Sequence, residues 1–443
     1  MINACVIAVS AMLLATGAFF TVKTRFVQLL GFFRRSRRLS RVKRQGSAVT
    51  PYMALATALG GSIGTANIAG VASALAIGGA GSIFWMWMSG LLGMATKYAE
   101  IKLAMRYRQS RSDGAPVGGA MYYMEKGLHS RRMGVVFAAL CVSGALLGGG
   151  MVQSNTIAES AAGMISALGV PADHFTVAAV AGVITAILCG GVILGGVESI
   201  ARVATMIVPL ASLLYVGASI AVIAVNAEEL PRAFSSIVTQ AFGIRPAVGG
   251  AAGYAFMLAL RTGIARGTFS NEAGIGSAPM AHASSSESDP HAQAMLGVVE
   301  VFVDTIVICT LTALVVLCSG IAIPYGAADA SGMLIAGDAF ATLLGGNASG
   351  IFLCVSVALF AITSIIGWSL YGERGVEYVF GERGVKPYRL ILVACIAIGA
   401  VVPVSIVWDM GEISNLLMAA VNIVALLALS AQVGDGREPR RLR

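Results

Sequence analysis

Long apolar stretches dominate this chain and limit it to very few folds. Eleven stretches are about as long as a helix that crosses a hydrocarbon core about 30 Å thick, which takes roughly 20 mostly apolar residues. They lie at 3–22, 50–78, 80–105, 134–166, 175–194, 200–226, 247–265, 292–322, 349–371, 388–407 and 412–432. Only helices and closed barrels satisfy their backbone in lipid, and these runs exceed the alternating segments of about ten residues that build barrels. The sequence therefore predicts an all-α, polytopic membrane protein.

Composition excludes several other classes of protein. Hydrophobic residues make up 57% of the 443 residues and charged residues 12%, against about 45–50% and about 25% in soluble domains. The net charge of +8 does not predict a nucleic-acid partner, because the basic residues are not interleaved with stacking aromatics on a soluble face. The seven cysteines stand singly in apolar stretches, and no HExxH motif is present. We expect no enzyme and no required protein partner; the lipid bilayer is the expected surrounding.

The placement of basic residues predicts the orientation. Nine Lys and Arg lie within 23–44 and four within 437–443. Eleven crossings with the N-terminus outside leave two of the 30 Lys and Arg in an outer loop (Arg232, Arg245) and three in crossings (Lys97, Lys102, Arg261). The remaining 25 then lie on the cytoplasmic side, as the positive-inside rule requires. The outer segment 323–347 contains a helix-like run at 333–344, which we interpret as a lid over an outer vestibule.

Ten of the stretches divide into two sets of five, which would cross the membrane in opposite directions. We expect the following parts: 1–22, an extra N-terminal helix; 23–48, a basic cytoplasmic segment; 49–226, the first repeat; 227–246, an external loop; 247–432, the second repeat; 433–443, a basic cytoplasmic tail. Each repeat opens with an irregular stretch, GGSIGTANIAG at 60–70 and RTGIARGTFSNEAGIGSAP at 261–279. Paired interruptions of this kind are typical of the binding site of a secondary transporter.

The glycine-rich run 60–70 suits the binding of an amino acid and a cation. Each glycine costs a helix about 1 kcal/mol relative to alanine, so unwinding is cheap there. An unwound helix offers free N–H groups to a carboxylate and free carbonyls to a small hard cation. Close packing of helices is the alternative explanation of clustered glycines. The polar side chains of Ser62, Thr65 and Asn67 within the run, and the second interruption, favour binding.

Several motifs resemble one known family. They are GSIGTANIAGVASALAIGGAGSIFWMWMSGLLGMATKYAE, GAPVGGAMYYMEKGL, MVQSNTIAES, ARGTFSNEAGIGSAPMAHA, VDTIVICTLTALV and IIGWSLYGE. In this order they are similar to the alanine or glycine:cation symporter family, whose architecture resembles the LeuT fold with one extra N-terminal helix.

The resemblance implies sodium-coupled import of small neutral amino acids, namely alanine and glycine and by extension serine and D-alanine. It further implies alternating access in a bacterial or archaeal cytoplasmic membrane, with sodium as the co-transported ion. A proton-coupled carrier of the same fold is the alternative. The family's usual Thr-Gly-Asn is here Thr65-Ala66-Asn67, which leaves the size limit of the substrate open.

The family pattern also places candidate substrate contacts. Gly64 and Thr65 would receive the carboxylate, and Asn67 either orients the same loop or binds a cation. Gln153 lies in mid-helix, with Thr156 and Ser160 at helical spacing, and its amide suits a carboxylate or an amine better than a merely structural hydrogen bond between helices. The full set expected to bind substrate is Gly64, Thr65, Asn67, Gln153, Phe256, Thr262, Gly263 and Trp368.

The sodium site and the gate follow from the same comparison. The LeuT-like pattern implies carbonyls of Gly60 and Ile63 facing the hydroxyls of Thr363 and Ser364, although such hydroxyls often bond to their own helix instead. Uncharged oxygens suit a monovalent ion that must leave again. Charged residues inside crossings are functional candidates. We expect Arg261, Glu300 and Asp304 to form an inner-gate network; Glu159 has no expected partner.

Overall fold

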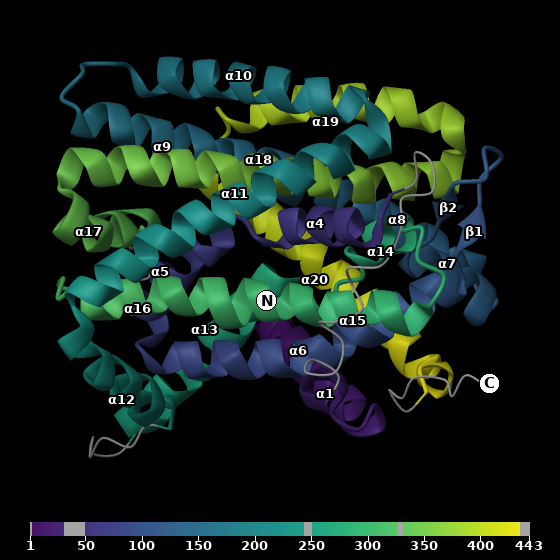
Figure 1. The fold of residues 1–443 in the computed structure, drawn as a ribbon, viewed down its shortest axis with the longest axis horizontal. Helices are drawn as coiled ribbons and strands as arrows, with labels where there is room; N and C mark the ends of the chain where they lie inside the picture. The colour runs from purple at the N-terminus through teal and green to yellow at the C-terminus, as the bar shows by residue number, and fades with distance from the viewer. Residues whose placement is uncertain (1, 31–48, 243–249, 327–330, 435–443) are drawn as a thin grey trace.

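The computed structural model describes residues 2–30, 49–242, 250–326 and 331–434, and these parts are almost entirely helical (Figure 1). Most of the long helices run roughly side by side along the longest axis of the molecule. Most of the predicted basic segment 23–48 and of the tail 433–443 lies outside the described residues. The elements of the first half are α1 (Ile2–Lys23), α2 (Val27–Leu30), α4 (Pro51–Ser62), η2 (Thr65–Asn67), α5 (Ala69–Gly78), α6 (Gly81–Arg106), β1 (Gln109–Ser110), β2 (Pro116–Val117), α7 (Ala120–Gly127), α8 (Arg131–Gly144), η3 (Ala145–Val152), α9 (Gln153–Ala167), α10 (His174–Leu194) and α11 (Gly196–Val225).

The second half continues the helical pattern. Its elements are η4 (Ala227–Glu229), α12 (Leu230–Ala241), α13 (Gly250–Asn271), α14 (Pro279–Ala283), α15 (Pro290–Val301), η5 (Phe302–Cys309), α16 (Thr310–Cys318), α17 (Gly332–Leu344), α18 (Gly346–Phe380), η6 (Glu382–Gly384), α19 (Val385–Gly399), α20 (Val404–Ala428) and η7 (Ser430–Gln432). The pairs α8 to α9 and α15 to α16 are joined by π-helical segments, η3 and η5. Such segments are frequent at functional sites.

Helices occupy all eleven predicted ranges. Among the described residues, seven helices are long and apolar enough to cross a membrane, and the bent pair α4 and α5 makes an eighth. The helices α6, α13 and α19 lie in the three other predicted ranges, and their crossing stays a prediction.

The first predicted break is present in the structure. Thr50 caps the start of α4 by accepting a hydrogen bond from the N–H of Met53 (3.2 Å). The helix ends at Ser62, because Ile63 and Gly64 are extended, and the axis turns by 61° before η2 and α5 continue. The glycine-rich run therefore interrupts a candidate membrane-spanning helix.

The second break lies later than its predicted start. The helix α13 continues without interruption through Arg261 as far as Asn271. It ends because Glu272 adopts a positive φ of 54°. Gly274 and Gly276, which follow, also have positive φ (90° and 87°), and glycine tolerates this conformation without strain. The predicted crossing 247–265 was therefore too short, and only 272–278 separate α13 from α14.

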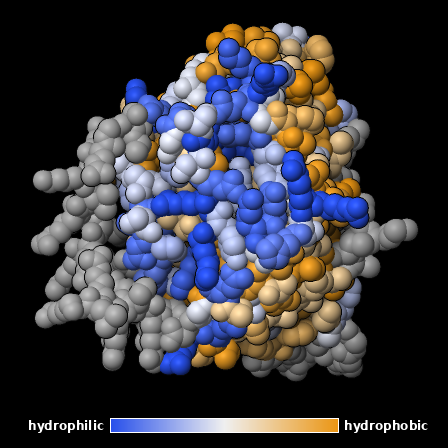
Figure 2. All heavy atoms as spheres, turned by 90° about the vertical axis from the view of Figure 1, so that its right-hand side faces the viewer, coloured by the Kyte–Doolittle hydropathy of each residue, from blue (hydrophilic) through white to orange (hydrophobic). Residues whose placement is uncertain are grey.

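One end of the molecule is strongly hydrophilic. Figure 2 shows this end as a broad hydrophilic surface bordered by hydrophobic side chains. The hairpin β1–β2 and the helix α7 lie here (Figure 1). Arg111 of the hairpin pairs with Glu377 near the end of α18, with 3.0 Å between Nε and Oε1. The hairpin is thereby attached to one of the longest helices of the core.

Close approach of α4 and α18 requires glycine on both sides. A Cβ atom on Gly367 would lie 2.7 Å from the nitrogen and 2.8 Å from the Cα of Gly61. A Cβ on Gly61 would lie 2.6 Å from the hydroxyl of Tyr371. Since backbone cannot give way as a flexible side chain can, this contact fixes how the broken helix lies against α18.

We predict that Gly367→Ala destabilises the protein by about 1–3 kcal/mol, because the methyl group overpacks a backbone contact. The matched control is Gly217→Ala in α11, where a Cβ meets nothing within 4 Å. That variant should be neutral or gain up to about 1 kcal/mol from helix propensity. Thermal unfolding in detergent measures both, and equal melting temperatures for the two variants would refute the assigned contact.

Candidate substrate and sodium site

Asn67 holds the shape of the first break. Its side-chain oxygen accepts a hydrogen bond from the N–H of Gly64 (2.9 Å), and its backbone carbonyl accepts one from the hydroxyl of Thr312 (2.8 Å). Its amide nitrogen donates to Asp304 and Ser270. Of the two roles considered for Asn67, the structure therefore supports orientation of the loop.

Two backbone donors of the break remain free. The N–H groups of Thr65 and Ala66 begin the short helix η2, and the first N–H groups of a helix have no acceptor within it. Neither group donates to another residue in the described chain. Since the N–H of Gly64 already binds Asn67, these two groups are the donors available to a carboxylate.

Gln153 and Ser364 meet the break at Gly64. A Cβ atom on Gly64 would lie 3.4 Å from the hydroxyl oxygen of Ser364 and 3.6 Å from the side-chain oxygen of Gln153. The side-chain oxygens of Gln153 and Thr65 are buried, and neither finds a hydrogen-bond partner in the described chain. Buried polar atoms are nearly always paired. The unpartnered oxygen of Gln153 beside Gly64, with Thr65 next in the chain, marks a place where a polar ligand fits.

Oxygen atoms of α4 and α18 come together beside this point. The hydroxyl of Ser364 donates to the carbonyl of Gly61 (3.1 Å), and a Cβ on Gly60 would lie 3.2 Å from the carbonyl oxygen of Thr363. The hydroxyl of Thr363 donates to Phe360 of its own helix (2.8 Å). The interface offers the uncharged hydroxyl and carbonyl oxygens that a monovalent cation needs. Ile63, the remaining predicted ligand, immediately precedes Gly64 and is 1% exposed.

Trp368 forms a buried wall that Glu272 positions. Its indole N–H donates to one oxygen of Glu272 (2.8 Å), and the hydroxyl of Ser277 donates to the other (2.6 Å). The ring packs edge-to-face against Tyr371, with 5.5 Å between centroids, and lies beside Gly149, where a Cβ would come within 2.6 Å of the ring atom Cγ. Glu272 was not predicted as a site residue, although it stands in the motif SNEAG of the second break.

Phe256, Thr262 and Gly263 are not brought to this site. They lie in the continuous helix α13, where Phe256 contacts the ring of Trp85 at 5.9 Å. A Cβ on Gly263 would approach the carbonyl oxygen of Ser82 to 2.1 Å, and Thr262 packs against Gly78. Because the second break comes later than expected, these residues serve the packing of α13 on α5 and α6.

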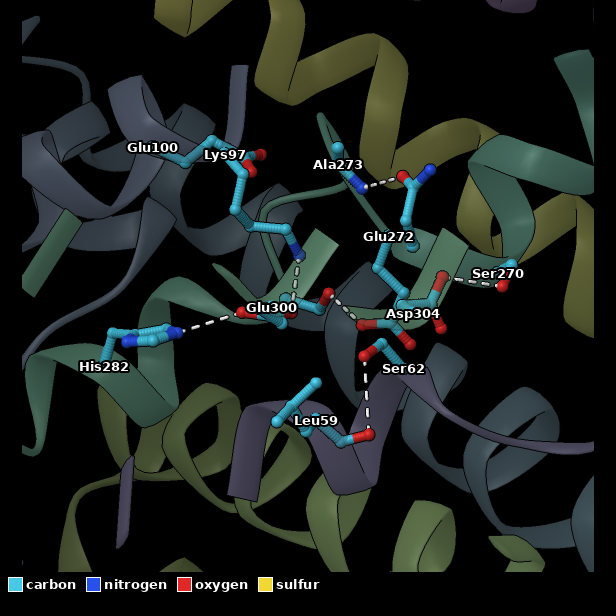
Figure 3. A network of polar contacts seen from close by, with 12 residues as sticks. Leu59, Ser62, Lys97, Glu100, Ser270, Glu272, Ala273, His282, Glu300 and Asp304 are labelled. Atoms are coloured by element: carbon cyan, nitrogen blue, oxygen red, sulfur yellow. Dashed lines mark hydrogen bonds and ion pairs between the residues drawn. The ribbon is translucent and has the colours of Figure 1, made fainter. Parts of the chain in front are cut away.

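Asp304 links the two breaks. Its carboxylate accepts hydrogen bonds from Asn67 (2.7 Å) in the first break and from Ser270 (2.8 Å) at the end of α13. A third comes from Thr305 (2.9 Å). Figure 3 shows Ser270 beside Asp304. A fully buried carboxylate thus connects the first break to the end of α13.

Glu300 belongs to a different network from the predicted one. Lys97 of α6 approaches it to 3.0 Å and His282 of α14 to 2.9 Å, and all three side chains are fully buried (Figure 3). Arg261 instead faces α1, beside Ile7 and other apolar residues. The predicted set of Arg261, Glu300 and Asp304 is therefore corrected. The cation that pairs with Glu300 is Lys97, because α6 turns Lys97 toward α15 whereas α13 turns Arg261 toward α1.

A cavity of about 970 Å³ opens at the end of the molecule where α17 lies, away from the hairpin. It is lined by residues of α5, α9, α13, α17 and α18, among them Thr156 and Ser160. Glu159, for which no partner was predicted, lies 3.2 Å from His174. The helix predicted at 333–344 is present as α17 and covers this cavity.

Comparison with known proteins shows the family to which this chain is similar. Residues 1–436 match the model of the sodium:alanine symporter family. The chain is 37% identical over 432 residues to the sodium/alanine symporter AgcS of Methanococcus maripaludis, covering 95% of this chain and 91% of that one. It is 36% identical over 429 residues to a probable sodium/glutamine symporter, GlnT, of Bacillus subtilis, with 95% and 85% covered.

The fold has a solved counterpart. The crystal structure of MhsT in complex with L-phenylalanine matches with a TM-score of 0.58 and 13% identity, covering 88% of this chain and 90% of that one. The predicted all-α, LeuT-like fold is thereby confirmed. With the family model matched over nearly the whole length, the chain is a transporter that belongs to the sodium:alanine symporter family.

Proposed function

We propose that this protein imports small neutral amino acids, chiefly alanine and glycine and by extension serine and D-alanine, together with sodium. The observation that carries the proposal is the convergence of Gly64, Gln153 and Ser364, where the buried side-chain oxygens of Gln153 and of the adjacent Thr65 have no hydrogen-bond partner in the described chain. Free N–H groups, an amide and hydroxyls at one point suit a zwitterion. The names of the relatives AgcS and GlnT support sodium and an amino acid as the pair that is carried.

The substrate carboxylate would be received by the N–H groups of Thr65 and Ala66 and by Gln153. Trp368 would close the pocket on the side of the second break. The methyl group of Ala66 lies 3.6 Å from the Cβ position of Gly70 at the start of α5, whereas the Cβ position of Gly64 faces Ser364 and Gln153. We infer that Ala66 narrows the pocket little. Sodium would lie between the carbonyls of Gly60 and Ile63 and the hydroxyls of Thr363 and Ser364.

We further propose an orientation of the protein in the membrane and an inner gate. The hairpin β1–β2 and α7, which lie at the hydrophilic end, carry basic residues, among them Arg111 and Lys126, so we place this end in the cytoplasm, with the C-terminus. The cavity below α17 then opens to the outside. The pairs of Glu300 with Lys97 and His282, and the Asp304 contacts, would act as the inner gate of an alternating-access cycle. We assign the chain to a bacterial or archaeal cytoplasmic membrane.

A proton-coupled carrier of the same fold remains the alternative. Asp304 is fully buried, and in the described chain its carboxylate accepts hydrogen bonds from the neutral side chains of Asn67, Ser270 and Thr305. A carboxylate in such surroundings is a candidate proton carrier. Its position between the two breaks would couple a proton to their movement.

The purified protein in liposomes should accumulate labelled alanine only under an inward sodium gradient. Replacing sodium by choline at fixed pH should abolish accumulation, because the cation site between α4 and α18 would be unfilled. Accumulation in choline under an inward proton gradient would instead favour the alternative. Competition by L- and D-alanine, glycine, serine and glutamine defines the size limit, and we expect the four small substrates to compete best.

Two variants separate the roles within the site. Gln153→Ala should weaken alanine binding about tenfold or more, since a hydrogen bond to a charged group contributes roughly 1.5–3 kcal/mol. Thr363→Ala should raise the sodium concentration for half-maximal uptake and leave the alanine affinity at saturating sodium nearly unchanged. Normal transport kinetics in both variants, at normal folded yield, would refute the assigned site.

A further inference from the structure

Arg266 is a charged side chain in α13 for which the site described above provides no role. It stands within the helix, although a crossing that ended at 265 would have left it in the cytoplasm. Its side chain is partly buried, and in the described chain it forms no hydrogen bond or ion pair. Glu412 of α20 acts on it electrostatically without reaching ion-pair distance. An unpaired charge at membrane depth is costly and indicates a function.

Arg266 lines the cavity beside α17. Two carboxylates line the same cavity, Glu159 and Asp338, and neither forms an ion pair with Arg266. The hydroxyls of Ser73 and Ser160 also face the cavity. Arg266 is therefore open to solutes that enter the cavity.

Several lining residues of the cavity stand about one helical turn from the candidate site. Three helical segments contribute a residue to the lining of the cavity. About one helical turn farther along, each also contributes a residue at or beside the candidate site. The pairs are Thr156 and Gln153 in α9, Gly70 and Asn67 across η2 and α5, and Arg266 and Ser270 in α13. A solute that moves down the cavity meets Arg266 one turn before it reaches the break.

We propose that Arg266 forms a capture position for the carboxylate of the incoming amino acid, above the central site. A guanidinium binds a carboxylate through two parallel hydrogen bonds, and the bond is strong where water is partly excluded. From there the carboxylate would pass to the free N–H groups of Thr65 and Ala66. The same charge would repel cationic side chains. This inference rests on the proposed function, since it names an amino acid as the solute.

The test compares Arg266→Gln and Arg266→Lys in liposomes at saturating sodium. Arg266→Gln should raise the apparent KM for alanine about tenfold while the maximal rate stays within twofold, and Arg266→Lys should recover part of the loss. External propionate, a carboxylate without an amine, should inhibit uptake by the unsubstituted protein and not by Arg266→Gln. Arg232→Gln is the matched control, because Arg232 is 83% exposed on α12 and pairs only with Glu229.

An unchanged KM in Arg266→Gln, or a lower maximal rate at unchanged KM, would overturn the inference; the second result would indicate a closing contact with Glu412. Folded yield and melting temperature of each variant exclude misfolding as the cause. Sodium-driven uptake by the unsubstituted protein tests the proposed function separately. Equilibrium binding of alanine to both proteins in detergent decides the role of Arg266 even where uptake needs no sodium.

Discussion

Backbone groups released by unwinding have no water to bind inside a hydrocarbon layer, so the first broken helix depends on its neighbours. Ser364 binds the carbonyl of Gly61, Thr312 binds the carbonyl of Asn67, and the side chain of Asn67 binds the N–H of Gly64. Each contact replaces a lost helical hydrogen bond. The close approach of α4 to α18, which Gly61 and Gly367 permit, brings Ser364 within reach.

The second break depends on the same neighbours through charged groups. Asp304 joins Asn67 to Ser270, and Glu272 joins the second break to Trp368 on α18. Both carboxylates are buried, so removing a partner would leave a charge or a donor unsatisfied, at a cost of several kcal/mol. Movement of one broken helix would therefore change the contacts of the other and of α18. This is the connection that a coupled carrier of two solutes requires.

The sequence predicted the architecture well, because long apolar runs and clustered basic residues report directly on membrane crossing. The predicted second break, 261–279, contains the observed one at 272–278 but begins too early, for a physical reason. Glycines stand at 263, 267, 274 and 276, and sequence does not reveal which of them end the helix. Gly263 and Gly267 prove to be packing positions against α6, whereas Gly274 and Gly276 adopt positive φ. Likewise, Lys97 and Arg261 are equivalent as charges in a crossing, and only the rotation of each helix decides which one meets Glu300.

We propose that one site, between the first break and α18, binds the amino acid and sodium at the same time. Equilibrium binding tests it directly, because the coupling between two ligands is reciprocal. Saturating sodium should raise the affinity for labelled alanine by some factor, saturating alanine should raise the affinity for sodium by the same factor, and Ser364→Ala should reduce both. An alanine affinity that is equal in sodium and in choline would contradict the account.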